Sequence, residues 1–386
     1  MTENYFCART YHEVTFYQDG FYRPCTEMFP VHSGLHIKSH SLDEFRGSSW
    51  LRELQNDLET GNLRTECRDC ISREQEGYGW RLSGNIDLAD RPLGGIKNLM
   101  IWLGNLCNAD CSMCNPTFSS KIDARLRQNP LPNFDTRNDA WLKPNQADQS
   151  GGQSFWWRDG QAKSRLIQMI EIADRIKILG GEPMLMPGVW EILDIVYQVD
   201  PKKTVSITTN ASILTEANQE SLIRFNNLQV NISVDAIGNT FEWIRHGLKW
   251  KTVQSNIPKI MHLSNKIEIN ATLSAHNIMA LEESIDYFES NGLTYGFWNV
   301  TRPYVVNIRN LPRDILLSRQ ETIKSMIKNS HVIKKKKTLM QLSLAITRAL
   351  HEQATDQATD ALIKYTEYLN SFRSKKFCTE TWKVID

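Results

Sequence analysis

From residue 96 onward, hydrophobic positions form short strand-like runs that alternate with helical patterns. The predicted strands are Ile96–Leu103, Ile176–Leu179, Thr204–Thr209, Leu228–Asp235, Ile267–Ser274 and Tyr295–Val300. Helical spacing lies between several of them and is clearest in Val189–Gln198, Glu216–Phe225 and Ala280–Ser290. Strands separated by helices favour a parallel sheet with right-handed crossovers. We therefore predict an α/β fold whose sheet is closed, or nearly closed, into a barrel.

The central strands of this prediction carry polar residues at every second position. The polar sets are Gln229, Asn231, Ser233 and Asp235 in one strand and Glu268, Asn270, Thr272 and Ser274 in the next. Parallel strands that are covered on both faces normally show unbroken apolar runs. Here the apolar face must pack against the helices, so the polar face is predicted to line a lumen that holds a ligand. The alternative, a half-solvated antiparallel sheet, is disfavoured because helices separate the strands.

The first 92 residues show a different pattern, with little regular periodicity. Apolar residues flank Asp19-Gly20, a sequence that is typical of a hairpin turn. Leu51, Leu54 and Leu58 have helical spacing. We therefore expect residues 1–92 to form a small cysteine-rich α+β module.

Two further segments complete the organisation of the chain. Residues 129–160, between the first two predicted strands, are rich in Asn, Asp, Pro and Gly, and they are equally typical of a lid and of a solvated insertion. No glycine follows Gly296, and residues 311–386 are predicted to form a helical C-terminal region. The barrel is expected to span residues 93–310.

The overall composition excludes several classes of protein. Lys and Arg number 45 against 44 acidic residues, which gives a formal charge of +1 and disfavours a nucleic-acid partner. No apolar run is long enough to span a bilayer, so no membrane partner is expected, and the first residues are polar rather than signal-like. The 11 Trp, 11 Tyr and 14 Phe residues require burial, which excludes disorder over most of the chain.

Cysteine gives the first indication of chemistry. Seven of the eight cysteines fall in the first third of the chain, in two groups. The groups are Cys7, Cys25, Cys67 and Cys70, followed by Cys107, Cys111 and Cys114. Clustered thiols in a long chain without a signal sequence indicate metal ligands rather than disulfides, and therefore the reducing cytoplasm. The remaining Cys378 is expected to be structural, with hydrogen-atom donation or cluster ligation as alternatives.

The second cysteine group has the spacing C-x3-C-x2-C and follows directly on the first barrel strand. α/β barrels place their active sites at this end of the strands. Three thiolates can hold three irons of a [4Fe–4S] cubane and leave the fourth iron open to a small chelating molecule. A structural zinc site is the alternative, although no fourth ligand lies close in sequence.

A second motif, Gly180-Gly181-Glu182-Pro183, stands directly after the second predicted strand. Two glycines let the backbone approach a ligand closely, and the acidic side chain can accept hydrogen bonds from an ammonium group. On its own this motif would indicate a turn. Beside a three-cysteine loop at the same edge of the barrel, it indicates a ligand site.

Together the two motifs resemble those of radical S-adenosylmethionine (SAM) enzymes, over about residues 96–303. The resemblance implies a partial (β/α)6 TIM-like barrel and a [4Fe–4S] cluster held by the second cysteine group. It also implies that the amino and carboxylate groups of SAM chelate the open iron, and that SAM is cleaved reductively to a 5′-deoxyadenosyl radical. Further SAM contacts are implied for Thr208, Thr209, Asn210, Ser233, Asp235, Phe297, Trp298 and Val300. The sequence departs from the family at Met113, where an aromatic residue is common, and in the fifth strand, which lacks a glycine-rich motif.

The first cysteine group resembles the twitch half of the SPASM/twitch domains, which carry an auxiliary cluster in radical SAM enzymes. Here the group precedes the barrel, as in members with an N-terminal twitch domain. The resemblance implies an auxiliary Fe–S cluster, of the [4Fe–4S] type, on these four thiolates. Zinc, or separate structural roles for the four cysteines, are the alternatives.

The activity implied by the resemblance is hydrogen abstraction from a substrate by the 5′-deoxyadenosyl radical. The implied substrate is a peptide, and the implied electron donor is an external protein of the flavodoxin or ferredoxin type. A small metabolite, sugar or nucleoside is the alternative substrate. The alternative of another class is a non-catalytic Fe–S or zinc protein that acts as a scaffold or redox sensor, and the intact motifs argue against it.

Overall fold

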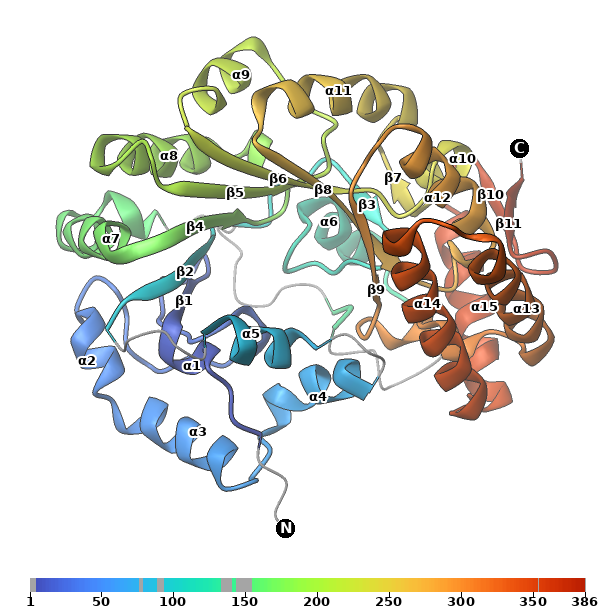
Figure 1. Cartoon of the computed structure of the whole chain (residues 1–386), viewed down its shortest axis with the longest axis horizontal. Coiled ribbons are helices and arrows are strands. Elements are labelled where there is room, and N and C mark those ends of the chain that lie inside the picture. Colours follow the sequence, from blue (N-terminus) through green and yellow to red (C-terminus); the bar gives the residue numbers. More distant parts are fainter. Residues whose placement is uncertain are drawn as a thin grey trace.

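The computed structural model describes residues 5–75, 79–88, 94–132, 141–143, 155–352 and 354–385. Within them, seven strands form one curved sheet in the order β1-β2-β4-β5-β6-β8-β9 (Figure 1). Each neighbouring pair in this sheet is parallel. The strands are β1 (Glu13–Phe16), β2 (Ile96–Trp102), β4 (Ala173–Leu179), β5 (Thr204–Thr209), β6 (Asn227–Ser233), β8 (Lys266–Leu273) and β9 (Tyr295–Asn299). The prediction of an α/β fold with a parallel, partly closed barrel is confirmed.

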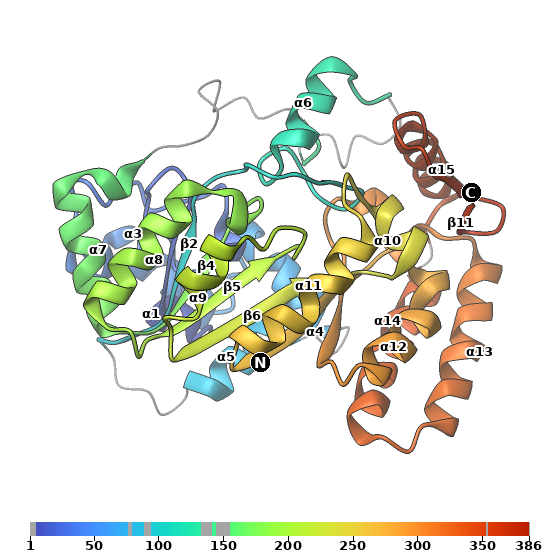
Figure 2. The same ribbon diagram turned by 90° about the horizontal axis from the view of Figure 1, so that it is seen from above.

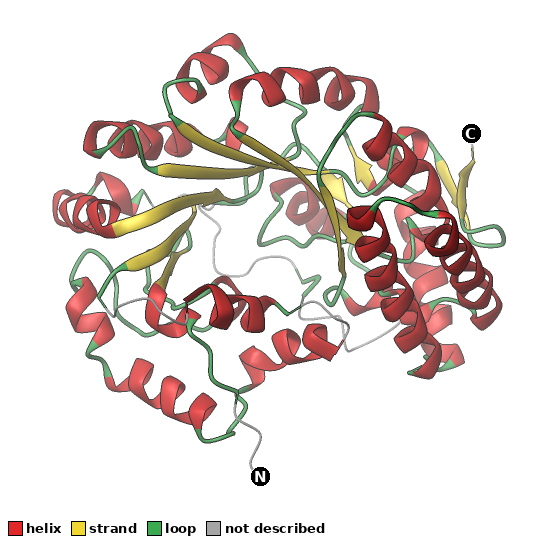
Figure 3. Ribbon diagram, in the orientation of Figure 1, coloured by secondary structure: helices red, strands yellow, loops and turns green. Residues whose placement is uncertain are grey.

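Helices cover the outer side of the curved sheet, as Figure 3 shows. They are α7 (Gly160–Ile172), α8 (Pro187–Val199), α9 (Glu216–Leu222), α11 (Trp250–Leu263) and α12 (Leu281–Ser290). Leu228, Val230 and Ile232 of β6 are buried in the hydrophobic core. The alternating pattern therefore has the predicted cause, because the polar positions of β6 lie on the inner side of the barrel.

The register of the parallel strands aligns the inward-facing polar residues in rows. Lys177 of β4 lies beside Ser206 of β5, and Ser206 lies beside Gln229 of β6. One pleat nearer the carboxyl ends, Asn231 lies beside Glu268 of β8. Polar side chains therefore lie side by side on the inner wall of the barrel from β4 to β8.

The first strand of the sheet comes from residues 1–92, which the sequence pattern assigned to a separate module. β1 pairs with β2 over four residues, from Glu13 with Asn98 to Phe16 with Ile101. Val14 and Phe16 are buried and extend the apolar face of the sheet. The strand has only four residues and is followed by a long irregular stretch, so its pattern is too short to predict that it pairs with β2.

Two local predictions for the N-terminal region are confirmed. Thr15 and Arg23 exchange backbone hydrogen bonds of 2.8 and 3.1 Å across the turn at Asp19-Gly20. Leu51, Leu54 and Leu58 are all buried along one side of a helix. The helices of this region are α1 (Arg9–His12), α2 (Leu42–Arg46), α3 (Ser49–Glu59), α4 (Arg68–Gln75) and α5 (Trp80–Leu88).

Helices α4 and α5 lie across the gap between β1 and β9, the two ends of the sheet (Figure 1). The Trp80 ring of α5 meets the Trp298 ring of β9 edge-on, with their centroids 6.3 Å apart. Arg73 of α4 donates a hydrogen bond of 3.1 Å to the hydroxyl of Thr301, which follows β9. The N-terminal region thus closes the side of the barrel that the sheet leaves open.

The C-terminal region is helical as predicted, except at its end. Its helices are α13 (Arg313–Asn329), α14 (Ile333–His351) and α15 (Asp356–Asn370), which lie at the opposite end of the molecule from α7 (Figure 2). The last residues instead form an antiparallel hairpin of β10 (Lys376–Cys378) and β11 (Lys383–Ile385). The hairpin forms because Phe377 packs against Trp243 and Trp382, which buries three aromatic rings.

Two further predictions concern membrane-spanning segments and the insertion in the barrel. None of the described helices is both long and apolar enough to cross a membrane. Most of the insertion at residues 129–160, interpreted as a lid or a solvated loop, lies outside the described residues.

Candidate active site

The three cysteines of the second group lie on one loop at the carboxyl end of β2. The loop contains the short strand β3 (Asp110–Cys111), which pairs antiparallel with β7 (Arg245–His246), and it is followed by α6 (Ser120–Gln128). This pairing sets Cys111 directly opposite Arg245. β7 follows α10 (Gly238–Ile244), which comes after β6. Two loops from different strands therefore build the site together.

The three thiols are near enough to interact electrostatically. Burial raises the pKa of Cys111 well above its usual value, and the neighbouring Cys114 and Cys107 raise it further. Burial followed by the charge of Cys107 raises the pKa of Cys114 to about 12. Three thiolates in one buried place repel each other, so ionisation of all three requires a positive charge beside them.

Arg245 is a site residue that the sequence analysis missed. Its Nε atom forms an ion pair of 2.8 Å with the Asp235 carboxylate, and its Nη1 atom lies 3.9 Å from the Cys111 sulfur. The Asp235 side chain is fully buried, and the Arg245 side chain is 12% exposed. The guanidinium lowers the pKa values of all three thiols. The sequence shows only a single arginine after an apolar helical stretch. The pairing of β3 with β7 is needed to show that this arginine lies beside Cys111.

We predict that Arg245→Met destabilises the protein by about 3–5 kcal/mol, because it leaves the Asp235 carboxylate buried without its partner. Arg127→Met is the matched control, since the Arg127 side chain is 42% exposed in its pair with Asp123. The control should cost less than about 1 kcal/mol. Chemical denaturation of both variants measures the difference, and equal losses would contradict the role given to Arg245.

The Gly180-Gly181 pair packs against the cysteine loop. The Gly181 amide donates a 3.0 Å hydrogen bond to the Gly104 carbonyl, and the Glu182 amide donates one of 2.8 Å to the Leu106 carbonyl. A Cβ atom on Gly181 would lie 2.3 Å from the Leu106 carbonyl oxygen. Gly180 has a φ of 148°, which strongly favours glycine. The glycines thus let two loops touch, immediately before Cys107.

Glu182 is held in place by three protein donors. Its carboxylate accepts hydrogen bonds from the Thr209 hydroxyl at 2.5 Å and from the Asn210 and Met184 amides at 2.7 and 3.0 Å. The side chain is buried, and burial raises its pKa. The carboxylate thus braces the β4 loop against the end of β5, and its contact with a ligand ammonium stays a prediction. Pro183 begins the short helical turn after it.

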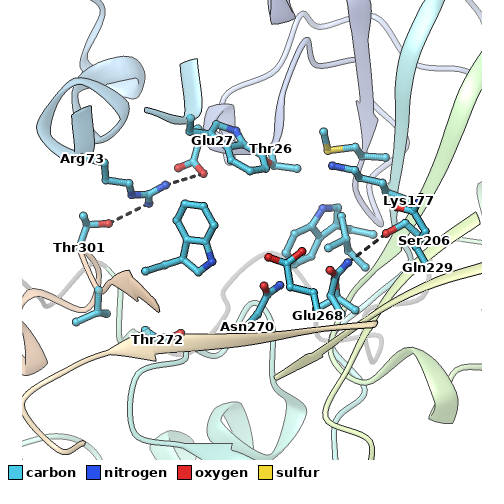
Figure 4. A pocket seen from close by; sticks show the side chains of 18 of the residues that line it. Thr26, Glu27, Arg73, Lys177, Ser206, Gln229, Glu268, Asn270, Thr272 and Thr301 are labelled. Carbon is cyan, nitrogen blue, oxygen red and sulfur yellow. Dashed lines mark hydrogen bonds and ion pairs between the residues drawn. The ribbon is translucent and has the colours of Figure 1, made fainter. Parts of the chain in front are cut away.

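Inside the barrel lies a cavity of about 570 Å³ (Figure 4). Inward-facing residues of the sheet line it, including Thr208, Asn270, Thr272, Trp298 and Val300. Met113, between the second and third cysteines of the loop, also reaches it. The predicted polar lumen is therefore present and opens toward the cysteine loop.

Four of the remaining predicted residues lie beside this cavity rather than on its wall. Phe297 lies on the other face of β9, packed against Tyr295, so it does not line the cavity. Asp235 is engaged by Arg245, and Asn210 donates a 2.9 Å hydrogen bond to Asn108 of the cysteine loop. Ser233 is the last residue of β6. Alternation within β9 explains the difference between Phe297 and its neighbour Trp298.

The first cysteine group gathers at the outer side of the same cavity. Burial raises the pKa of Cys25 well above its usual value, with further increases from Cys7, Cys70 and Cys67. Burial and, after it, the charge of Cys7 raise the pKa of Cys67 to about 12. The four thiols, which are far apart in the sequence, therefore lie together.

An ion pair stands between this group and the cavity. Glu27 follows Cys25 closely, Arg73 follows Cys70 on α4, and their side chains meet at 3.1 Å (Figure 4). Both side chains line the cavity. Cys378 lies elsewhere, in the C-terminal hairpin, where hydrogen bonds with Thr381 and Glu380 lower its pKa. In the part of the chain that the structure describes, no three Cys, His, Asp or Glu side chains are placed to hold a single metal ion.

Comparison with known proteins bears on this site. No family model matches the chain. GTP 3′,8-cyclase of Staphylococcus epidermidis is 25% identical over 126 residues, which make up 32% of this chain and 37% of that protein. GTP 3′,8-cyclase of Alkaliphilus oremlandii is 36% identical over 67 residues, 17% of this chain and 20% of that protein. GTP 3′,8-cyclases are radical SAM enzymes. The chain is similar to radical SAM enzymes.

Solved structures similar to this chain also include radical SAM enzymes. One is anSMEcpe with bound AdoMet, with a TM-score of 0.42 and 14% identity, covering 61% of this chain and 62% of the other. Another is Streptococcus suis SuiB bound to the precursor peptide SuiA, with a TM-score of 0.41 and 14% identity, covering 82% of this chain and 70% of the other. The chain spans little more than a third of the length of the curated radical SAM relative from S. epidermidis.

Proposed function

We propose that this protein is a radical SAM enzyme that cleaves SAM reductively and uses the 5′-deoxyadenosyl radical to abstract a hydrogen atom from a substrate in the barrel cavity. The observation that carries the proposal is the convergence of Cys107, Cys111 and Cys114 at the mouth of a polar lumen, opposite Arg245. When bound, a [4Fe–4S] cluster supplies the electron that splits SAM. Three thiolates suit such a cluster because they leave one iron for SAM.

The chain's own residues would hold, orient and shield the reactants. Arg245 compensates part of the negative charge of the thiolates, as its effect on their pKa values indicates. Gly181 and Glu182 fix the cysteine loop against the ends of β4 and β5. Thr208, Trp298 and Val300 offer polar and apolar surface to SAM at the cavity wall. The enclosed lumen would exclude water from the radical.

The proposed substrate class is a peptide, with a small metabolite, sugar or nucleoside as the second candidate. The peptide proposal is supported by the resemblance of the N-terminal cysteine group to a twitch domain. A cavity of about 570 Å³ would admit a side chain and its flanking backbone, or one small metabolite. An external flavodoxin- or ferredoxin-type protein is the proposed electron donor.

The test of this proposal is anaerobic reconstitution with iron and sulfide, followed by reduction with dithionite in the presence of SAM. The expected result is formation of 5′-deoxyadenosine and methionine in equal amounts. A protein that takes up a [4Fe–4S] cluster but yields no 5′-deoxyadenosine, with or without candidate substrates, would overturn the proposal.

We further propose that Cys7, Cys25, Cys67 and Cys70 hold an auxiliary [4Fe–4S] cluster, since their four thiols gather beside the cavity. The prediction is that a variant with Cys107, Cys111 and Cys114 changed to alanine still binds about four iron and four sulfide ions per chain. Zinc with no sulfide in that variant would contradict the proposal, and changing Cys25 as well should remove the remaining iron.

A further inference from the structure

One wall of the cavity carries more positive than negative charge. Lys177 and Arg175 lie on the inner face of β4, and both line the cavity. Arg9 of α1 stands beside them, with its guanidinium carbon 4.3 Å from the centre of the Trp80 ring. The Lys177 ammonium lies 5.6 Å from the same ring. Two cations, Arg9 and Lys177, therefore lie against one indole, and the charge of Arg175 acts on Lys177 from the same strand.

The carboxylate that faces these cations is Glu13 of β1; its Oε1 atom is engaged, while its Oε2 atom has no hydrogen-bond partner among the described residues. It forms an ion pair of 2.5 Å with Arg9 and accepts a hydrogen bond of 2.5 Å from the Asn98 side chain. Glu13 is 2% exposed. One carboxylate shared in this way leaves a positive excess at the wall, in a place where low polarity strengthens electrostatic attraction.

Several hydrogen-bond donors at this wall have no partner. Within the described residues, the Nε atom of Arg175 and the indole N–H groups of Trp80 and Trp102 are buried without an acceptor. The Lys177 ammonium lies over the Trp80 ring and interacts electrostatically with Glu13, but no hydrogen bond joins it to a described residue. Because an unsatisfied buried donor costs about 1–3 kcal/mol, three of them on residues that line one cavity indicate an acceptor that the protein itself does not provide.

We propose that the β4 wall binds an anionic group of the substrate, a carboxylate or a phosphate, through Lys177 and Arg175, with the Trp80 indole N–H as an additional donor. The inference rests on the proposed function, since that function places the substrate in this cavity. It narrows the substrate class to molecules that carry a negative charge.

The position of the wall also fixes the direction of the bound substrate. Lys177 precedes Gly180 by three residues, a rise of about 10 Å along the strand. The anionic group would therefore be held deep in the barrel, and the remainder of the substrate would extend toward the cysteine loop. A reacting carbon atom would lie between the two, close to Leu179 and Thr208, which line the cavity at that level.

Binding of the anion should depend on pH. The pKa of Lys177 is lowered to about 8, mainly by burial, with Glu13 raising it and Arg175 and Arg9 lowering it. On the opposite wall, Lys266 and Glu268 of β8 face the cavity, and Glu27 and Arg73 form their own pair. Lys177 is charged below its pKa, so anion affinity should be full below pH 8 and fall as pH rises above it. The arginines remain charged throughout this range.

The experiment is isothermal titration calorimetry of the reconstituted full chain with two probes, inorganic pyrophosphate and glutarate. We expect one probe to bind with one-to-one stoichiometry, and the stronger probe shows whether the group is a phosphate or a carboxylate. Lys177→Met should weaken binding at least about tenfold, the loss expected for one hydrogen bond to a charged group. Lys266→Met is the matched control, because Lys266 also lines the cavity but is exposed, and it should change affinity less than about twofold.

Lys177→Arg provides a second variant that keeps the charge. It should retain the affinity but lose the decline above pH 8, a signature that a purely structural lysine would not produce. The inference is overturned if neither probe binds, if Lys177→Met binds as tightly as the parent, or if saturating SAM displaces the probe, since the anion site would then belong to SAM.

The two proposals fail in distinguishable ways. Formation of 5′-deoxyadenosine without substrate is measured on the same preparations. A protein that cleaves SAM but binds neither anion overturns the anion site alone. A protein that binds an anion through Lys177 but never cleaves SAM overturns the proposed function alone.

Discussion

Simultaneous replacement of Cys107, Cys111 and Cys114 by alanine should reduce 5′-deoxyadenosine formation to below about one thousandth of the parent rate. The expected loss is this large because the change removes the redox centre, whereas the loss of a single contact is worth only about 1–3 kcal/mol of barrier. The measurement is product formation from SAM under reducing, anaerobic conditions. Iron and sulfide analysis on the same samples shows how much cluster remains.

Cys378→Ala is the matched control for this experiment. Cys378 is also a free thiol, but it lies in the C-terminal hairpin, where β10 pairs with β11. Its variant should keep the parent rate and iron content. Unchanged turnover in the triple variant would show that the cysteine loop is not the reaction centre. A large loss of activity in Cys378→Ala would instead support hydrogen-atom donation by the Cys378 thiol.

Gly181→Ala should lower SAM cleavage about 100-fold while leaving all seven clustered cysteines in place. A methyl group at this position would stand 2.3 Å from the Leu106 carbonyl oxygen and 2.7 Å from the Asn105 carbonyl, both backbone atoms. The cysteine loop must move to make room, and a displacement of about 1 Å at reacting groups is enough for a loss of about 100-fold. Overpacking should also cost about 1–3 kcal/mol of stability.

Gly160→Ala is the control for the glycine experiment. Gly160 begins α7, and a Cβ atom there would meet no other atom within 4 Å. This variant should keep its activity and gain a few tenths of a kcal/mol or more, because alanine is the better helix former. Equal activity in Gly181→Ala and Gly160→Ala would show that the glycine motif does not position the cysteine loop.

The strands and helices of the barrel could be predicted from the local pattern of apolar and polar residues. The predicted strand Thr204–Thr209 matches β5 at both ends, and five other strands were located to within a few residues. Among the polar positions predicted to line the lumen, those nearer the start of β6 and β8 do so, namely Gln229, Asn231, Glu268, Asn270 and Thr272, whereas Ser233, Asp235 and Ser274 do not. These predictions succeed because a side-chain period of two or of 3.6 is a property of the element itself and needs no knowledge of its neighbours.

The hydrogen-bond partners of Glu182 could not be predicted from the residues next to it in the sequence. Its residue type and its place after a strand predicted a ligand contact, but they did not predict the hydrogen bonds that its carboxylate accepts from Thr209 and from the Asn210 and Met184 amides. Asn210 lies 28 residues away in sequence. Which partner satisfies a buried carboxylate depends on what the fold brings beside it, and spacing along the chain does not contain that information.

The sequence by itself determined the α/β barrel, its polar lumen and the two cysteine groups, because each is recorded in periodicity or in spacing over a few residues. Only the tertiary structure decided that β1 joins the sheet, that α4 and α5 close it, and that Arg245 faces Cys111. It also decided that Lys177 meets more cations than anions. Such facts depend on contacts between residues distant in sequence, where burial and charge act through space and not along the chain.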